Sequence, residues 1–475
     1  MKNIPTMKPL FKFLLINYPI LKINMNSIFV ILPNQLFEPD FVLLKKYSKI
    51  YLIEEPYFFS ETIKPNKIKI AYMKACMLCY YDYLKLNKVD NVFYMSFEEI
   101  IKNKYDFLMN KLIHLYEIND FKLSYKYKGF NLTEFETPMF ICKKKDLDKY
   151  DGYYKLKKPT HATFYEMTKN ILGILQDVKN QDIYNRKNPK INVKFDNKIS
   201  YVNKNNIKYY NAGIKYANSN LFKSHIGNAT LEHLKIYPIN SIDAYKAYKM
   251  FLNKNLKYFG LFQDVINDKN QFLYHSIISP MLNIGLLNPL KLILIIKKYR
   301  QLIPLNSYEG FIRQIIGWRE YMHYLYKYKY DELIIANNHK NYKKIDKSWY
   351  NATTGVLVID TEIKKAINYG YAHHIIRLMV FLNFLILSEI NPNDIYKWFM
   401  EIVSIDAYDW VMIPNIYSMG YFSSIGMKRP YLSSSNYILK MSNYKKNGKW
   451  ELLWNSLFRN FVKSRKVNFY FIFLK

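Results

Sequence analysis

From residue 27 to about residue 140 the chain repeats one pattern, in which short runs of β-branched and aromatic residues are separated by longer amphipathic stretches. The runs are SIFVILP from residue 27, KIYLIEE from residue 49 and NVFYMS from residue 91. Such an alternation is typical of βαβ units, which build a parallel sheet covered by helices. We therefore expect a Rossmann-like α/β domain over residues 27–144, with ligands at the carboxyl ends of its strands.

Two further changes of pattern divide the rest of the chain. Residues 145–235 lose the strand rhythm and gain charged residues and asparagine, which indicates an interdomain linker. From residue 236 to residue 475, apolar residues at helical spacing are divided by proline and glycine, which predicts a larger all-α C-terminal domain. Residues 1–26 are expected to form an N-terminal extension without a membrane segment, because Asn17 and Pro19 interrupt their apolar run.

The charge balance favours a polyanionic partner. The chain carries 70 Lys and Arg residues against 38 Asp and Glu residues, a formal net charge of +32. Nucleic acid is the first candidate for such a partner. The alternative is a lysine-rich surface without a partner of this kind.

Cysteine usage indicates a reducing intracellular compartment, the cytoplasm or the nucleus. Only Cys76, Cys79 and Cys142 occur, an odd number without a disulfide framework. Cys76 and Cys79 lie in an amphipathic stretch, so we interpret them as structural residues and expect no metal site.

One segment has the features of an anion site. In FLYHSIISPMLNIGLLNP, His275, Ser276 and Ser279 precede Pro280. Hydroxyl groups beside the free N–H groups of a helix start can bind a phosphate. The alternative is an ordinary helix cap.

A second segment mixes charge, amide and indole on an apolar helix. EGFIRQIIGWREYMH carries Arg313, Gln314, Trp318 and Arg319 within a few turns. Such a mixture is costly inside a core unless a ligand compensates for it. Trp318 offers a stacking surface and the arginines offer phosphate contacts. The alternative is a partly exposed basic helix.

The third segment, YAHHIIRLMVFLNF, carries His373, His374 and Arg377 into an otherwise apolar run. A buried arginine requires an anion. The sequence offers Asp406 and Asp409 downstream, and we predict an ion pair between Arg377 and Asp406. The alternative is a solvated charge beside core histidines.

Taken together, these segments resemble the deoxyribodipyrimidine photolyase-related branch of the photolyase and cryptochrome superfamily, whose bacterial members carry an iron–sulfur cluster. The motifs run in order through nearly the whole chain: LPNQLF, YLIEEPYFF, FYEMTKNILGIL, YNRKNP, YHSIISPMLNIGLLNP, EGFIRQIIGWREY, GYAHHIIRLMVFLNF, DAYDWVMIPNIYSMG and KRPYLSSSNYILKMSNY.

The resemblance implies an N-terminal α/β antenna domain and a C-terminal all-helical domain that binds FAD. The cofactor-binding residues that it implies are Phe262, His275, Ser276, Ser279, Asn283, Gln314, Arg319, Arg377, Asp406 and Met412. A ribityllumazine antenna is also implied, with Gln35 and Glu55 near predicted strand ends.

The resemblance also implies roles in catalysis. His373 and His374 would face a lesion pocket, where an imidazole can donate a proton to a damaged base. Tyr431 would act beside them. Contacts to a flipped-out lesion or to DNA would come from Arg186, Trp318 and Tyr431, and an electron relay would use Trp398 and Tyr350.

One departure from this branch concerns its [4Fe–4S] cluster, which needs four cysteine thiolates. The matching positions here are Val358, Lys445, Gly448 and Leu452, and no cysteine follows Cys142. We therefore predict no iron–sulfur cluster. The C-terminal segment is instead expected to be held by packing of Trp450, Trp454, Leu457 and Phe461.

The resemblance favours a monomeric, light-driven, FAD-dependent photolyase that repairs UV-damaged DNA. Pyrimidine (6-4) photoproducts are favoured over cyclobutane dimers because of the paired histidines. Two alternatives remain open: a cryptochrome-like FAD photoreceptor without repair activity, and a basic DNA-binding protein without flavin.

Overall fold

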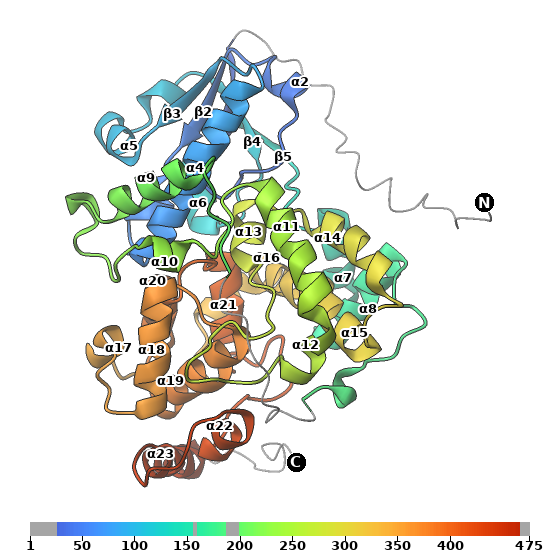
Figure 1. The fold of residues 1–475 in the computed structure, drawn as a ribbon, viewed down its shortest axis with the longest axis vertical. Helices are drawn as coiled ribbons and strands as arrows, with labels where there is room; N and C mark the ends of the chain where they lie inside the picture. Colours follow the sequence, from blue (N-terminus) through green and yellow to red (C-terminus); the bar gives the residue numbers. More distant parts are fainter. Residues whose placement is uncertain (1–25, 155–158, 187–198, 466–475) are drawn as a thin grey trace.

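A five-stranded parallel sheet forms the N-terminal part of the protein. The computed structural model describes residues 26–154, 159–186 and 199–465 (Figure 1). The sheet has the order β3-β2-β1-β4-β5, and every pairing is parallel. The order reverses between β1 and β4, as expected of a Rossmann-like sheet. The strands are β1 (Ser27–Ile31), β2 (Lys49–Ile53), β3 (Val92–Met95), β4 (Leu112–Tyr116) and β5 (Asn131–Phe135).

Short helices and one long helix connect these strands. They are α2 (Phe41–Leu44), α3 (Pro56–Phe59), α4 (Lys67–Leu86), α5 (Phe97–Asn103), η1 (Asp106–Leu108) and α6 (Phe121–Tyr127). Local sequence fixes where they begin. The Asn66 side chain caps α4, and Ser96 with Glu99 forms a capping box at the start of α5.

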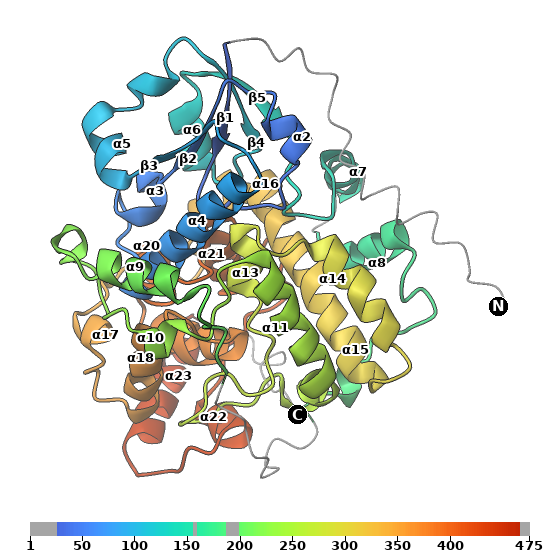
Figure 2. The same cartoon turned by 45° about the horizontal axis from the view of Figure 1, so that its top comes forward.

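The long helix α4 is buried on more than one side, because it lies between the sheet and α9 (Ile207–Ala217) (Figure 2). A Cβ atom on Gly213 of α9 would lie 2.3 Å from the Ala71 carbonyl oxygen, so only glycine permits this close approach. Cys76 is buried in α4 and Cys79 is half-buried, which agrees with structural roles.

The segment from 145 to 235 contains helices although its composition predicts a linker. These elements are α7 (Lys144–Tyr154), α8 (His161–Leu172), η2 (Asp182–Tyr184), α9, η3 (Asn220–Phe222) and α10 (Leu231–Leu234). Helix α8 packs against the C-terminal part of the chain, whereas α9 packs on α4. Each helix buries only one face, which accounts for the polar composition.

From residue 241 onward, every regular element of the described chain is a helix. The helices are α11 (Ser241–Lys254), α12 (Leu256–Phe262), α13 (Ser279–Ile284), α14 (Pro289–Ile296), η4 (Lys297–Tyr299), α15 (Leu305–Ile312), η5 (Arg313–Arg319), α16 (Glu320–Ile334), α17 (Ser348–Asn351), α18 (Leu357–Tyr369), η6 (Ile376–Leu382), α19 (Asn383–Leu387), α20 (Pro392–Ile402), α21 (Asp409–Tyr417), α22 (Ser435–Met441) and α23 (Trp450–Arg465). The predicted fold class, an α/β part followed by a larger helical part, is confirmed. Proline stands in the first turn of α13, α14 and α20, as the sequence punctuation indicates.

Aromatic packing holds the C-terminal helix α23. Trp450, Trp454 and Phe461 are each at most 2% exposed, and Leu457 packs partly buried against the same core. The Trp454 ring lies 4.9 Å from the ring of Phe384 in α19, and its Nε1 donates to the Ser433 carbonyl oxygen. The predicted packing of these four residues is therefore confirmed.

Two features are absent from the described residues. None of the helices in these ranges is both long enough and apolar enough to cross a bilayer. The same ranges contain no group of three or more His, Cys, Asp or Glu residues arranged to hold a metal ion.

Truncation of Trp454 tests the packing of α23. We expect Trp454→Ala to lower the free energy of unfolding by about 3–5 kcal/mol, because it leaves a cavity under the helix. Leu452 on the same helix is 59% exposed, so Leu452→Ala should change that free energy by less than about 0.5 kcal/mol. Denaturant unfolding of both variants checks this, and equal effects would contradict it.

Candidate functional site

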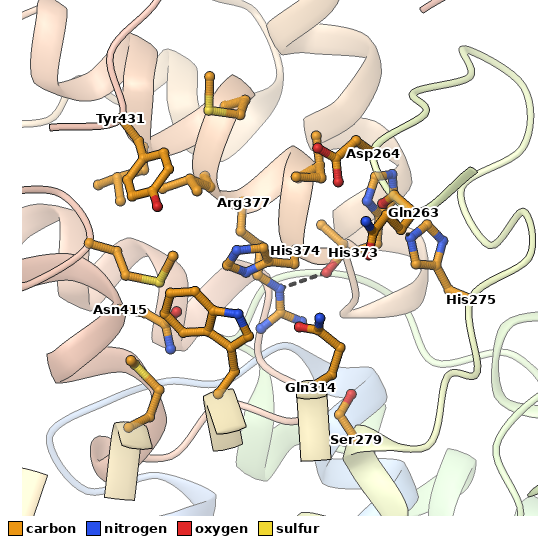
Figure 3. A pocket seen from close by; sticks show the side chains of 18 of the residues that line it. Gln263, Asp264, His275, Ser279, Gln314, His373, His374, Arg377, Asn415 and Tyr431 are labelled. Carbon is orange, nitrogen blue, oxygen red and sulfur yellow. Dashed lines mark hydrogen bonds between the residues drawn. The ribbon is translucent and has the colours of Figure 1, made fainter. Parts of the chain in front are cut away.

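A cavity of about 930 Å³ lies in the helical part of the protein. Its volume is in the range of small-molecule and cofactor sites, about 300–1,000 Å³. The lining comes from the segment before α13, from η5, from residues 371–382, from α21 and from residues 429–441. Figure 3 shows His374, Arg377 and Gln314 pointing into this space, with Tyr431 across from them.

Both helices that cross the cavity widen into π-helix there, η5 around Arg313–Arg319 and η6 around Ile376–Leu382. A π turn is uncommon and is found mostly at functional sites. Here it occurs in the two segments that carry the predicted arginines and Trp318.

The predicted ion pair forms in the cavity wall. Arg377 Nη2 lies 2.7 Å from Asp406 Oδ1, and Arg377 Nε donates to the Ala372 carbonyl oxygen at 2.6 Å. The two side chains are 14% and 7% exposed. Asn283 Nδ2 donates to the Asp406 backbone carbonyl oxygen at 2.8 Å, so the aspartate is held from two sides. The alternative of a solvated Arg377 is excluded.

The two adjacent histidines both line the cavity but differ in environment. His373 is 2% exposed, and its ring stacks on that of His275 at 4.4 Å. His374 is exposed to the cavity, and its ring points into it (Figure 3). Burial, followed by the charge of Arg377, lowers the pKa of His374 from 6.5 to about 4. Burial also lowers the pKa of His373 well below 6.5, so both imidazoles are neutral at pH 7.

Arg319 joins the cavity wall to the end of the α/β part. Its Nη1 donates to the Met139 carbonyl oxygen at 2.7 Å, and its guanidinium lies 4.6 Å above the Phe140 ring and 4.9 Å from the Trp410 ring. Burial lowers the pKa of this guanidinium to about 10. Gln314 nearby donates to the Gly310 carbonyl oxygen at 3.0 Å. The alternative of an exposed basic helix does not apply to these residues.

Residues 276–279, which we call the serine segment, line the cavity together with His275. Helix α13 begins after Ile278 and has no side-chain cap, so the hydroxyl groups of Ser276 and Ser279 do not serve as its cap. The His275 ring nitrogens face the carbonyl oxygens of Phe272 and Gln263 at 3.1 and 3.0 Å. The helix-cap alternative is therefore wrong.

Arg186 lies at the cavity in a network of charges. Its Nη1 lies 2.7 Å from Asp182 Oδ2 and its Nε lies 2.5 Å from Asp264 Oδ2. Arg313 contacts the other Asp182 oxygen at 2.8 Å. Although burial raises the pKa of Asp182, hydrogen bonds from both arginines outweigh it and lower this pKa to about 2. Arg186 is therefore paired in this structure.

Four other predicted residues divide into two groups. Met412 and Tyr431 line the cavity, and Met412 is 2% exposed. Trp398 and Tyr350 are not part of the lining. The Trp398 ring lies 5.1 Å from that of Phe399, which does line the cavity, and 5.4 Å from that of Trp349.

The predicted placement of Phe262 at the cofactor site is wrong, because the structure does not bring this residue to the cavity. Its ring packs on Tyr274 at 5.0 Å in a small separate cluster. Phe259 and Gln263, which are spaced by four residues, face the cavity instead. Positions i and i+4 share a helical face, and Phe262 points away from it.

Sequence reasoning missed several lining residues with polar atoms. Gln263 Nε2 and Trp410 Nε1 are buried and have no hydrogen-bond partner in the part of the chain that the structure describes. Asn415 also lines the cavity (Figure 3). Single polar residues in apolar helices have no sequence pattern of their own. The one available signal was the presence of a Trp and an Asn in the otherwise apolar DAYDWVMIPN segment.

Gln35 and Glu55, the predicted antenna residues, lie at the carboxyl edge of the sheet, but their side chains are buried. Glu55 is 0% exposed and accepts hydrogen bonds from the hydroxyl groups of Tyr105 and Tyr127 and from Lys126 Nζ. Gln35 is 3% exposed and donates to the Tyr116 carbonyl oxygen at 2.8 Å. Both side chains are therefore buried and held by hydrogen bonds within the α/β part.

The chain is similar to known proteins over part of its length. A family model described as deoxyribodipyrimidine photo-lyase-related protein matches residues 29–232. A (6-4) photolyase of Agrobacterium fabrum (strain C58 / ATCC 33970) is 35% identical over 212 residues, which make up 44% of this chain and 42% of that protein. Residues 29–232 of this chain are thus similar to the deoxyribodipyrimidine photolyase-related family, and the chain spans less than half the length of that (6-4) photolyase.

Solved structures extend the likeness to nearly the whole chain. A bacterial class III photolyase from Agrobacterium tumefaciens aligns with a TM-score of 0.57 at 15% identity, covering 94% of this chain and 90% of that one. An archaeal photolyase from Sulfolobus tokodaii, solved with two FAD molecules, aligns with a TM-score of 0.53 at 13% identity, covering 93% of this chain and 100% of that one. At these identities the structures establish the two-part fold.

The cavity has a donor set that fits FAD. Among the described residues, the buried lining donors without a hydrogen-bond partner include Gln263 Nε2, Trp410 Nε1 and Arg319 Nε. An unpaired buried donor is costly, so each one favours a ligand acceptor nearby. Flavin carbonyl groups and phosphate oxygens are such acceptors. The residues present therefore fit this cofactor.

The depressed pKa of His374 predicts a pH dependence of stability. The unfolded chain binds a proton at this residue near pH 6.5 and the folded chain only near pH 4. The stabilisation from neutral His374 is thus complete above pH 6.5 and is lost as the pH falls towards 4. We expect His374→Gln to lose less unfolding free energy than the wild type between pH 7 and pH 4.5, measured by denaturant unfolding. Between pH 7 and pH 8 the unfolding free energies of the two proteins should change equally with pH. An equal change between pH 7 and pH 4.5 would contradict the lowered pKa of His374.

Proposed function

We propose that this protein is a light-driven, FAD-dependent DNA photolyase that acts on UV-induced pyrimidine lesions, with (6-4) photoproducts as the favoured substrate. The observation that carries the proposal is one cavity in which the buried Arg377–Asp406 pair and the open, neutral His374 share a wall. Such a wall combines a fixed charge pair with a group that can move a proton.

In this proposal, FAD lies in the cavity between the serine segment and the ion pair. Ser276, Ser279 and His275 are proposed phosphate-side contacts; Asn283, Gln314, Arg319, Arg377, Asp406 and Met412 are proposed to line the rest of the cofactor site. Bound reduced FAD would supply, on illumination, the electron that opens the lesion. The ion pair is proposed to orient the ring system, because neither partner can move without leaving the other unpaired.

His374 is the proposed proton donor to the lesion. A neutral imidazole carries one N–H group, which can donate its proton to a base and recover it later. His373 is proposed to keep its neighbour in place by stacking on His275, and Tyr431 to contact the lesion from the opposite wall. Trp318 offers a stacking surface for a flipped-out base. Damaged bases stack poorly, which lowers the cost of flipping them.

DNA is the proposed partner, bound through the positive charge of the protein. Phosphate contacts by Lys and Arg supply most sequence-independent affinity. Arg186 is proposed to exchange its carboxylate partners for DNA or the lesion. We also propose a monomer in a reducing intracellular compartment.

Electron supply to the cavity is proposed to pass through Trp398, with Tyr350 near its outer end. Phe399 stands between Trp398 and the cavity, with its ring 5.1 Å from that of Trp398. Because phenylalanine cannot lose a proton, it acts here only as a spacer. We propose no iron–sulfur cluster, since no cysteine follows Cys142, and no ribityllumazine at Gln35 and Glu55.

A second candidate is a cryptochrome-like FAD photoreceptor without repair. It is favoured by the pairing of Arg186 with Asp182 and Asp264, which removes one cation from DNA contact. Both proposed functions require bound flavin, but only a photolyase would remove the lesion in light.

The test is illumination of the purified protein with an oligonucleotide that carries one (6-4) photoproduct, in the presence of reductant. We expect light-dependent loss of the lesion by the wild type. His374→Ala should retain its flavin and lose repair by about 10²–10⁴-fold, the usual contribution of a positioned proton donor.

The control is His233→Ala, since His233 lies in α10 against the ring of Tyr369, outside the cavity. It should repair like the wild type. Flavin without repair in the wild type would favour the photoreceptor, and repair by His374→Ala at the wild-type rate would remove His374 from the mechanism.

A further inference from the structure

A ring of α8 lies directly behind Trp318. The imidazole of His161 stacks on the indole with ring centroids 4.0 Å apart and an angle of 12° between the planes. On its cavity side, Trp318 lies 6.4 Å from His374 at a tilt of 36°. Trp318 and His374 line the cavity, whereas His161 is not part of the lining. The indole therefore has one face covered by protein and the other towards the cavity.

The backbone of η5 leaves room for this stack. A Cβ atom on Gly317 would lie 2.8 Å from His161 Nε2 and 3.3 Å from Tyr165 Cδ2. Any larger residue at position 317 would push the imidazole away from the indole. Glycine next to Trp318 is thus a condition of the stack.

The start of α8 is fixed independently of the cavity. Thr160 caps the helix by accepting from the Thr163 N–H, and the Tyr150 hydroxyl donates to the Thr160 carbonyl oxygen at 3.2 Å. The Tyr321 hydroxyl donates to the Pro159 carbonyl oxygen at 3.1 Å. His161 is the first residue of this anchored helix, so its ring has a rigid support.

The imidazole contributes its flat face and no charge. Burial, followed by the charge of Arg313, lowers the pKa of His161 to about 3, so the ring is neutral. Its buried Nε2 has no hydrogen-bond partner among the described residues. A polar atom left in this condition is unfavourable for folding alone. The closest ring contact of this imidazole is with the indole at 4.0 Å, whereas the rings of Tyr321 and Tyr165 lie at 5.9 and 6.2 Å.

We propose that His161 is a positioning residue that holds the indole of Trp318 flat as a stacking platform for a pyrimidine extruded from DNA, and so sets the preference for damaged over intact duplex. The inference rests on the proposed function. A base stacked on an aromatic ring gains affinity only if the ring is already in place, and His161 removes the freedom of the indole to rotate. Intact duplex keeps its bases stacked inside and does not reach Trp318.

The test is binding in the dark, where no photochemistry occurs, of a labelled duplex with one (6-4) photoproduct and of the same duplex without it. Fluorescence anisotropy gives both affinities. We expect His161→Ala to weaken binding of the damaged duplex about tenfold, within the usual contribution of one base–aromatic stack, and to leave the intact duplex unchanged. Gly317→Ala should act in the same direction, because its methyl group displaces the imidazole.

Two further variants separate positioning from general damage to the fold. His161→Phe restores a flat ring and should bind the damaged duplex within about threefold of the wild type. His233→Ala removes a histidine that packs on an aromatic ring outside the cavity, and should bind like the wild type. Lesion loss in light at saturating DNA should stay within about twofold for His161→Ala, since His161 contacts no reacting group.

Wild-type affinity of His161→Ala for the damaged duplex would overturn the positioning role while leaving the proposed function intact. Equal weakening on both duplexes, without rescue by His161→Phe, would overturn it as well. If the wild type does not prefer the damaged duplex, the proposed function itself fails and this inference fails with it.

Discussion

The structure depends on two buried cations, from two different helical segments, that hold the same short segment of chain. Arg377 pairs with Asp406 in the cavity wall, and Lys69 of α4 donates to the Ala407 carbonyl oxygen at 2.6 Å. Asp409, two residues further on, accepts from the Tyr57 hydroxyl at 2.8 Å, and its N–H donates to Asp120 Oδ1 at 3.1 Å. The segment that forms the cavity wall is thereby fixed to the α/β part. Because a buried charge must stay paired, this arrangement is rigid.

Burial also shifts the pKa values of the ionisable side chains around this segment. Burial lowers the pKa of Lys69 to about 8, and burial together with the charge of Asp409 raises the pKa of Asp120 to about 7. The α/β part therefore has a structural task in this protein: it supplies the groups that position the cavity wall. This task does not require a chromophore at Gln35 or Glu55, whose side chains are buried and hydrogen-bonded.

How much could be predicted from the sequence follows from the physical origin of each signal. The first three strands were predictable because their runs of β-branched and aromatic residues are uninterrupted, whereas β4 carries His114 at its centre and β5 carries Asn131 and Glu134. Arg377 and Asp406 could be paired in advance because a buried arginine needs an anion. The helices between 145 and 235 were missed, since each of them buries one face only.

Other features depend on tertiary structure and had no signal in the chain. Phe262 was assigned to the cavity, but the helix turns it away and presents Phe259 and Gln263. The π turns of η5 and η6 follow from packing around the cavity. The stack of His161 on Trp318 joins residues 157 positions apart and depends on the missing side chain of Gly317.

The central claim is that the cavity with the Arg377–Asp406 pair in its wall holds FAD. The most direct measurement is the amount of FAD released per chain when the purified, folded protein is denatured, compared between the wild type and Asp406→Asn. The account predicts about one FAD per wild-type chain and a clear loss in the variant, in which the Arg377 charge has no carboxylate partner. A wild-type protein that is folded, unfolds cooperatively and binds no FAD even when the cofactor is added would contradict it.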